Sequence, residues 1–220
     1  MPSNSEKKFK ANCKDIHRLM EIHSDMAGED RGRKYGVEVL NKSAVVLICA
    51  VWEAYVEDLI GEALDHFTAN LTNPISLPKE LRKIIAEKVK TDKNELAPWD
   101  LSGTGWKLVL TANLESMKKQ FTGAWHSPKA AQVDQLIEKT LGLPSVTDCW
   151  KRTTLTPKIA RQKLDEYVRL RGDIAHRNHA AEAVTKADAT AFLEHVTRLV
   201  EFTDKAINEH VLKITGKPLF

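Results

Sequence analysis

An arginine and a histidine, Arg171 and His176, stand five residues apart in a charged stretch late in the chain. On an α-helix this spacing corresponds to about 1.4 turns and about 140° of rotation, so the two side chains flank one shallow groove. The guanidinium binds phosphate oxygens with a planar fork of donors, and the imidazole gives or takes a proton near neutral pH. The pair suits chemistry at a phosphodiester. The same spacing also occurs on solvated, charged helices that have no catalytic role.

Basic residues concentrate around this pair. Eight lysines and arginines but three acidic residues lie between Lys151 and Ala180, whereas the whole 220-residue chain has a net charge of only +3. A local excess of this kind favours a polyanionic partner, with a solvated basic face as the alternative. The side chains that we predict to contact such a partner are Lys163, Arg169, Arg177 and His179.

Glu53 is the acidic residue most relevant to this chemistry. It follows Val51 and Trp52 in an apolar stretch, and a carboxylate near a protein core requires a cationic partner. Arg171 is one candidate for that partner. Either a structural salt bridge or a catalytic carboxylate would result.

Other chemistry finds less support in the sequence. His176 and His179 are three residues apart, as metal ligands can be, but no carboxylate or cysteine obviously completes a zinc site, so we expect no metal. Gly103 and Gly105 lack the lysine that follows in a Walker motif, and no cofactor is predicted. Trp99 and Trp125 can stack a nucleobase or hold their own loops in place.

The cellular setting is predicted from cysteines and hydropathy. Cys13, Cys49 and Cys149 are widely spaced and form no Cys-x-x-Cys motif, which argues against disulfides. The N-terminus has no apolar signal segment, and the longest apolar run, Ala44–Trp52, is too short to span a bilayer. We therefore expect a soluble cytoplasmic protein with no membrane partner.

Hydrophobic periodicity predicts an all-α protein, with a central helix over about 35–70 whose segment 44–52 is apolar on all sides. Ser127-Pro128 and Thr156-Pro157 have the composition of helix starts, Gly142 that of a helix end, and Thr185-x-x-Asp188 resembles a capping box. One domain over 1–220 is expected, with the irregular stretch 70–156 as an insertion on the bundle. The other helices are expected over 5–27, 79–90, 106–121 and 146–151, with a loop over 91–105 and further helices after Ser127-Pro128, Thr156-Pro157 and Thr185.

Three pieces of sequence, in this order, resemble the HEPN superfamily and its RiboL-PSP branch. The first is Val51-Trp-Glu-Ala-Tyr-Val56 on the long apolar helix. The second is the middle segment, with His126-Ser-Pro-Lys, Val133-Asp-Gln-Leu-Ile and Leu141-Gly-Leu-Pro. The third is the Arg-x4-His motif formed by Arg171 and His176. The resemblance covers most of the chain.

This resemblance implies a HEPN-like helical bundle that forms a homodimer, in which the motifs of two chains meet at one cleft. It also implies a metal-independent endoribonuclease of toxin–antitoxin or antiviral defence, with an antitoxin or another defence subunit as partner. Arg171 would bind the scissile phosphate, His176 would transfer protons, and Asp173 would orient either of them. Family members often carry Asn or Asp directly after the arginine, where this chain has Gly172. The alternative implied function is a non-catalytic interaction or nucleotide-binding module that acts as a dimeric scaffold.

Overall fold

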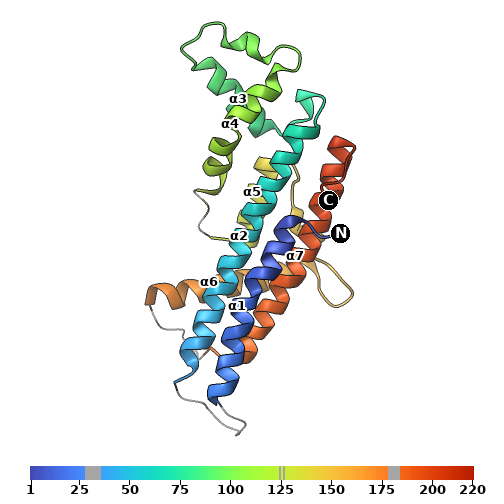
Figure 1. Ribbon diagram of the computed structural model, residues 1–220. Helices are drawn as coiled ribbons and strands as arrows, with labels where there is room; N and C mark the ends of the chain where they lie inside the picture. The colour runs from blue at the N-terminus through green and yellow to red at the C-terminus, as the bar shows by residue number, and fades with distance from the viewer. Residues whose placement is uncertain (28–35, 124, 126, 178–183) are drawn as a thin grey trace.

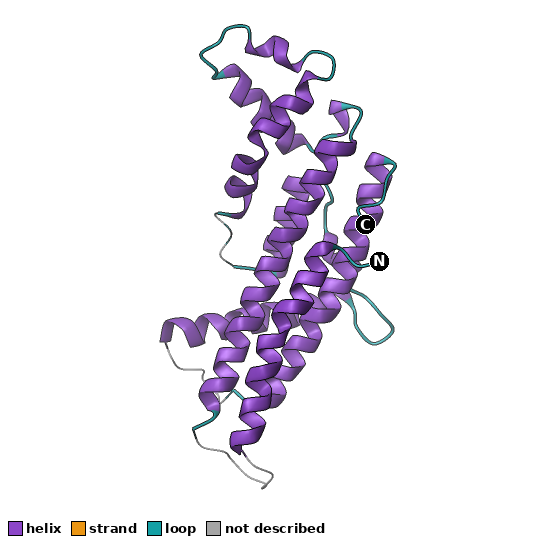
Figure 2. Ribbon diagram, in the orientation of Figure 1, coloured by secondary structure: helices purple, strands orange, loops and turns teal. Residues whose placement is uncertain are grey.

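The computed structural model describes residues 1–27, 36–123, 125, 127–177 and 184–220, with the backbone alone for Ala27, His176 and Arg177. In these residues every regular element is helical, and no strand occurs (Figure 2). The prediction of an all-α fold is therefore confirmed. The α-helices are α1 (Asn4–Ala27), α2 (Glu38–Asn70), α3 (Lys79–Lys90), α4 (Gly105–Thr122), α5 (Ala130–Leu141), α6 (Pro157–Arg177) and α7 (Lys186–Thr215). Short 3-10 turns, η1 (Pro74–Ser76), η2 (Ala97–Leu101) and η3 (Val146–Cys149), lie between them.

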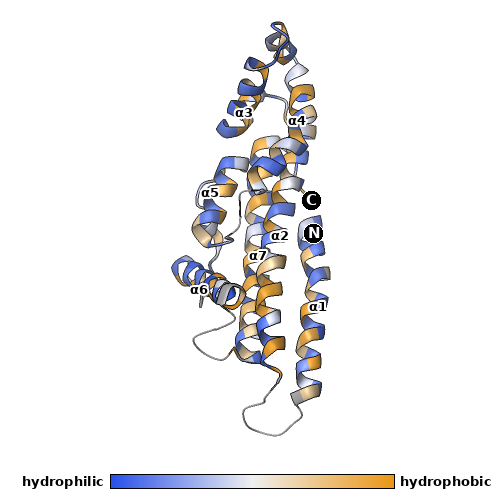
Figure 3. Ribbon diagram, turned by 90° about the vertical axis from the view of Figure 1, so that its left-hand side faces the viewer, coloured by the Kyte–Doolittle hydropathy of each residue, from blue (hydrophilic) through white to orange (hydrophobic). Residues whose placement is uncertain are grey.

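The central element of the bundle is α2, which packs against α1, α7, α6, α4 and α5. Figure 1 shows α1, α2 and α7 running side by side, with α6 crossing them at a large angle. Hydrophobic residues concentrate along α2 and α7 (Figure 3), and both helices supply many of the buried side chains. The prediction for segment 44–52 needs one correction: Leu47 and Ala50 are exposed, so α2 is not buried on every side.

Trp52 joins the bundle to the segment that precedes α5. Its indole is fully buried, contacts Trp150 edge-on and donates a hydrogen bond of 3.1 Å to the carbonyl oxygen of Pro128. The middle of the chain is thus fastened to the central helix by a buried polar contact as well as by apolar packing.

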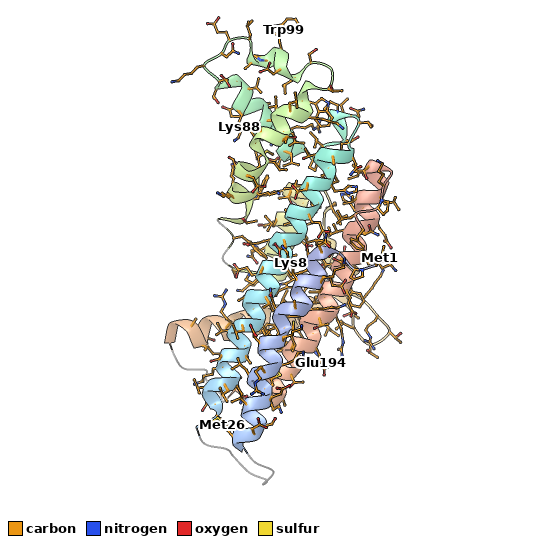
Figure 4. The ribbon with its side chains drawn as sticks, viewed as in Figure 1. Met1, Lys8, Met26, Lys88, Trp99 and Glu194 are labelled. Atoms are coloured by element: carbon orange, nitrogen blue, oxygen red, sulfur yellow. The ribbon has the colours of Figure 1, made fainter. Side chains whose placement is uncertain are left out.

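The helices α3 and α4, joined through η2, extend beyond the end of the long helices (Figure 1). Trp99 lies at the outer end of this arm, as Figure 4 shows, with 75% of its surface exposed. The predicted loop over 91–105 therefore contains one helical turn. Within the described residues, no helix has the length and hydropathy needed to cross a membrane.

The predicted helix ends are mostly confirmed. Thr185 and Asp188 form a capping box, and Gly142 ends α5 in the left-handed region at φ 75°. The hydroxyl of Thr156 accepts a hydrogen bond from the backbone N–H of Ile159 at the start of α6.

Two predicted helix starts are wrong. The central helix begins at Glu38 rather than near residue 35. Gly36 precedes it at φ 82°, a backbone conformation that interrupts a helix. Residue 35 itself lies outside the described residues. The helix after Ser127-Pro128 begins at Ala130, two residues after the predicted start at Pro128. The carboxylate of Asp165 on α6 accepts a 2.9 Å hydrogen bond from the N–H of Ala130 at this point. A tertiary contact, rather than the local Ser-Pro signal, caps this helix.

A buried carboxylate holds the N-terminus against α7. Asp204 is 2% exposed and accepts hydrogen bonds from both the backbone N–H (3.0 Å) and the hydroxyl of Ser3, with the Tyr55 hydroxyl at 3.4 Å. Burial raises the pKa of Asp204 to about 6; the Ser3 hydrogen bonds oppose this shift, and the neighbouring Glu6 carboxyl adds to it. The folded chain therefore binds a proton here more tightly than the unfolded chain does.

This pKa predicts a specific pH dependence of stability. A carboxyl whose pKa is raised by folding stabilises the fold below its unfolded pKa, and that contribution is lost as pH rises through about 6. The Asp204 contribution to the free energy of unfolding should therefore fall by about 1 kcal/mol from pH 5 to pH 7. His195 and His210, whose pKa values burial lowers, contribute in the opposite direction. Asp204→Asn should remove this contribution in urea denaturation, whereas Asp58→Asn, at a half-buried surface residue that pairs with Lys8, should retain it. Equal slopes in the wild type and Asp204→Asn would contradict the assignment.

Candidate functional site

Helix α6 presents one buried side to the bundle and one side to solvent. Ala160, Leu164, Val168 and Ile174 form the buried side. Two further apolar residues of α6, Ile159 and Ala175, are exposed. Ile159 is turned about 100° away from the buried Ala160, and Ala175 lies near the C-terminal end of the helix. The buried side fixes the rotation of α6 about its axis and so decides where its charged residues lie.

Arg171 lies against the central helix α2. Its Nη2 is 3.7 Å from Oε2 of Glu53, and the two side chains are 24% and 25% exposed. The predicted pairing of Glu53 with Arg171 is therefore present. At 3.7 Å it is an ion pair without hydrogen-bond geometry.

The Cys49 thiol, one turn before Glu53 on α2, also lies beside Arg171. Burial raises the pKa of Cys49 to about 12, and the charge and hydrogen bonding of Arg171 reduce this effect without reversing it. Cys49 is therefore a protonated, buried side chain. The spacing of Cys49 and Glu53, i and i+4 on one helix, was the signal that could have identified this second neighbour of Arg171.

The guanidinium is held in place and still accessible. Arginine has five N–H donors, and a single carboxylate at 3.7 Å cannot occupy all of them. A quarter of its side chain is exposed, so a phosphate from outside the chain can approach it.

The other predicted residues of α6 take different positions around the helix. Lys163 and Arg169 are exposed, and Asp173 is half-buried. The rotation from Lys163 to Arg171 is about 80°, which places both toward one side, while Asp173 is about 200° from Arg171. Helix geometry therefore does not bring Asp173 onto the face of Arg171.

The remaining predicted residues can be placed only in part. His179 lies outside the described residues, and so do the side chains of His176 and Arg177. The backbone of α6 is helical through Arg177, so His176 follows Arg171 at the helical spacing that the sequence predicted. Among the described residues, no three His, Cys, Asp or Glu side chains are grouped in a way that could hold a metal ion.

An all-α bundle with an Arg-x4-His sequence on a helix near its C-terminal end defines a HEPN-type domain. The chain matches the family model described as RiboL-PSP-HEPN over residues 10–209, and it belongs to this family. No curated protein and no solved structure matches it. HEPN domains are often ribonucleases, and they commonly bind RNA and dimerise.

The Arg171–Glu53 pair predicts a measurable coupling. In a double-mutant cycle with Glu53→Gln and Arg171→Gln, the interaction energy from urea denaturation should be about 1 kcal/mol, because both groups are largely withdrawn from water. The cycle cancels whatever else each side chain contacts.

The matched control is the exposed pair formed by Glu194 and Arg198, one turn apart on α7. Its cycle should give about 0.3 kcal/mol, the usual value for a solvated i,i+4 pair. Equal coupling in the two cycles would mean that Glu53 does no more for Arg171 than a surface charge does.

Proposed function

We propose that this protein is a metal-independent endoribonuclease that acts as a homodimer. The observation that carries the proposal is the position of Arg171, held against Glu53 of the central helix and five residues before His176 on α6. Family membership supports the same activity, since HEPN domains are often ribonucleases.

The reaction is an internal transesterification of RNA. A base takes the proton of a ribose 2′-OH, and the oxygen attacks the adjacent phosphorus while an acid protonates the leaving 5′-oxygen. The products are a 2′,3′-cyclic phosphate and a 5′-OH. In this proposal Arg171 neutralises charge that develops on the phosphate, and His176 supplies acid–base catalysis.

The exposed basic side chains of α6 give the substrate strand a path to the site. Lys163 lies toward the side of Arg171, whereas Arg169, about 200° from Arg171 around α6, is exposed on the other side of the helix. Each can bind a phosphate of the strand without reading its sequence. Arg177 and His179 are the further RNA contacts that we propose.

The surface that we propose for dimerisation is an exposed apolar stripe on α2. Val39, Leu47 and Ala50 are exposed, and helical geometry places all three within about 80° of one another. Exposed apolar side chains in one stripe suit a two-fold contact between copies of the same chain. Such a contact brings the two α6 motifs toward each other.

The alternative is a non-catalytic HEPN module that binds RNA or a nucleotide as a dimeric scaffold. One observation favours it: Gly172 stands directly after Arg171, where the family often has a polar side chain, and Asp173 lies away from the Arg171 face. In either form, a role in toxin–antitoxin or antiviral defence, with an antitoxin or another defence subunit as partner, is part of the proposal.

Cleavage should need the 2′-OH and no metal. The purified protein, incubated with end-labelled RNA in EDTA, should leave cyclic-phosphate ends, and DNA of the same sequence should remain intact. A single 2′-deoxy nucleotide at a mapped cut site should abolish cleavage there, because the nucleophile is missing. Cleavage that persists at this position, or that stops in EDTA, would exclude the mechanism and revive a metal site at His176 and His179.

The dimer surface predicts a paired result. Leu47→Glu places a charge in the α2 stripe and should convert a dimer into a monomer in multi-angle light scattering, with loss of cleavage. Leu108→Glu, at a leucine on α4 that is 76% exposed, should leave both the mass and the cleavage unchanged. Neither change touches the core, so circular dichroism should report full folding for both. A dimer that survives Leu47→Glu would place the interface elsewhere.

A further inference from the structure

A cavity with an aromatic wall lies between α3, α4 and α5, away from the residues of the proposed cleavage site. Its volume is ≈ 460 Å³. That is within the range typical of small-molecule sites. Its apolar wall is formed by Ile84, Phe121, Trp125 and Leu136.

Within the part of the chain that the structure describes, two polar atoms of residues that line this cavity have no hydrogen-bond partner. They are Nε1 of Trp125, a donor, and Oε1 of Gln132, an acceptor. Trp125 is 7% exposed, and solvent reaches neither atom. By contrast, the fully buried indoles of Trp52 and Trp150 donate to Pro128 O and to the Thr203 hydroxyl. A buried unsatisfied polar group costs about 1–3 kcal/mol, so the cavity lining retains an unused donor and an unused acceptor.

Lysine side chains lie in and beside this cavity. Lys139 and Glu80 line the cavity and also a second hollow beside it, to which Lys79 contributes. Lys83 pairs with Glu80 at 2.8 Å, and Lys83, Lys79 and Lys139 together lower the pKa of that carboxyl. Three ammonium groups therefore surround one carboxylate, with Glu138 as the other acid of the adjoining hollow. The whole of α3 carries five basic and two acidic residues.

We propose that this cavity binds a nucleotide, with the base inside and the phosphate at Lys79 and Lys139. The planar base packs on the aromatic wall, as bases do on aromatic side chains in nucleic-acid-binding proteins. Every nucleobase presents a donor beside an acceptor on its pairing edge. In this proposal the Gln132 amide turns about its terminal torsion, and the Trp125 indole shifts with it, so that the two atoms buried in the free protein face that edge.

The proposed nucleotide is either a free mononucleotide or one residue of an RNA strand, because both carry the same base and phosphate. The cavity shares no lining residue with the Arg171–Glu53 pair. Binding here therefore does not depend on cleavage by the chain.

The indole N–H signals of the five tryptophans allow a direct test. In ¹⁵N-labelled full-length protein, the four ribonucleoside 5′-monophosphates and a short RNA oligonucleotide are titrated separately to millimolar concentration. At least one should shift the Trp125 signal saturably, while the signal of Trp99, at the outer end of the arm, stays in place (Figure 4). Saturation by a mononucleotide assigns a free nucleotide, and saturation by the oligonucleotide alone assigns a strand residue.

Paired variants separate the two halves of the ligand. Lys139→Gln should weaken binding of the shifted monophosphate about tenfold, the effect of one charge-assisted hydrogen bond, and leave the nucleoside unaffected. Gln132→Leu should weaken both, and Lys107→Gln on α4 should weaken neither.

The proposal is overturned if no nucleotide or oligonucleotide moves the Trp125 signal, since the cavity is then filled by water alone. It is also overturned if inorganic phosphate produces the same shift, or if Lys107→Gln weakens binding as much as Lys139→Gln.

Discussion

The ion pair between Glu53 and Arg171 is the contact on which the arrangement of the functional helix depends. Glu53 lies in the middle of α2, the helix that contacts five of the other six described α-helices. A carboxylate so close to the core is stable only beside a cation, and the guanidinium of Arg171 is 3.7 Å away. The apolar side of α6 sets the rotation of the helix, and the Glu53 carboxylate then favours the position of the guanidinium that we propose binds phosphate.

Further polar contacts hold α6 from its first half. Asp165 accepts from the N-terminus of α5, and Arg161 pairs with Asp148 and contacts the Thr147 hydroxyl in η3. The helix is therefore fixed to the middle segment at one end and to α2 at the other. Helix α5 of this segment also forms one wall of the cavity between α3, α4 and α5. The same segment therefore contacts both α6 and the arm formed by α3 and α4.

The sequence allowed the fold class and the Arg171–Glu53 contact to be predicted because each depends on local pattern and charge balance. Apolar spacing determined the helices, and one carboxylate in an apolar run required a cation. The predicted start of α5 was wrong because the residue that caps this helix, Asp165, lies 35 residues further along the chain. The exposure of Leu47 and Ala50 was missed because hydropathy alone does not tell which neighbours cover a helix. The cavity beside Trp125 could not be predicted from the sequence for the same reason, because three helices must pack together to form it.

We propose that two copies of α6 form one RNA-cleaving site. In-line displacement needs a base and an acid on opposite sides of phosphorus, and the histidines of two chains related by a two-fold axis can provide them. The most direct test uses a tandem-tagged heterodimer of wild type and His176→Ala, purified away from both homodimers and assayed on one defined RNA in EDTA. We expect loss of nearly all cleavage, because the single shared cleft lacks one of its two groups. Retention of about half the wild-type rate, as two independent sites would give, would contradict the shared site.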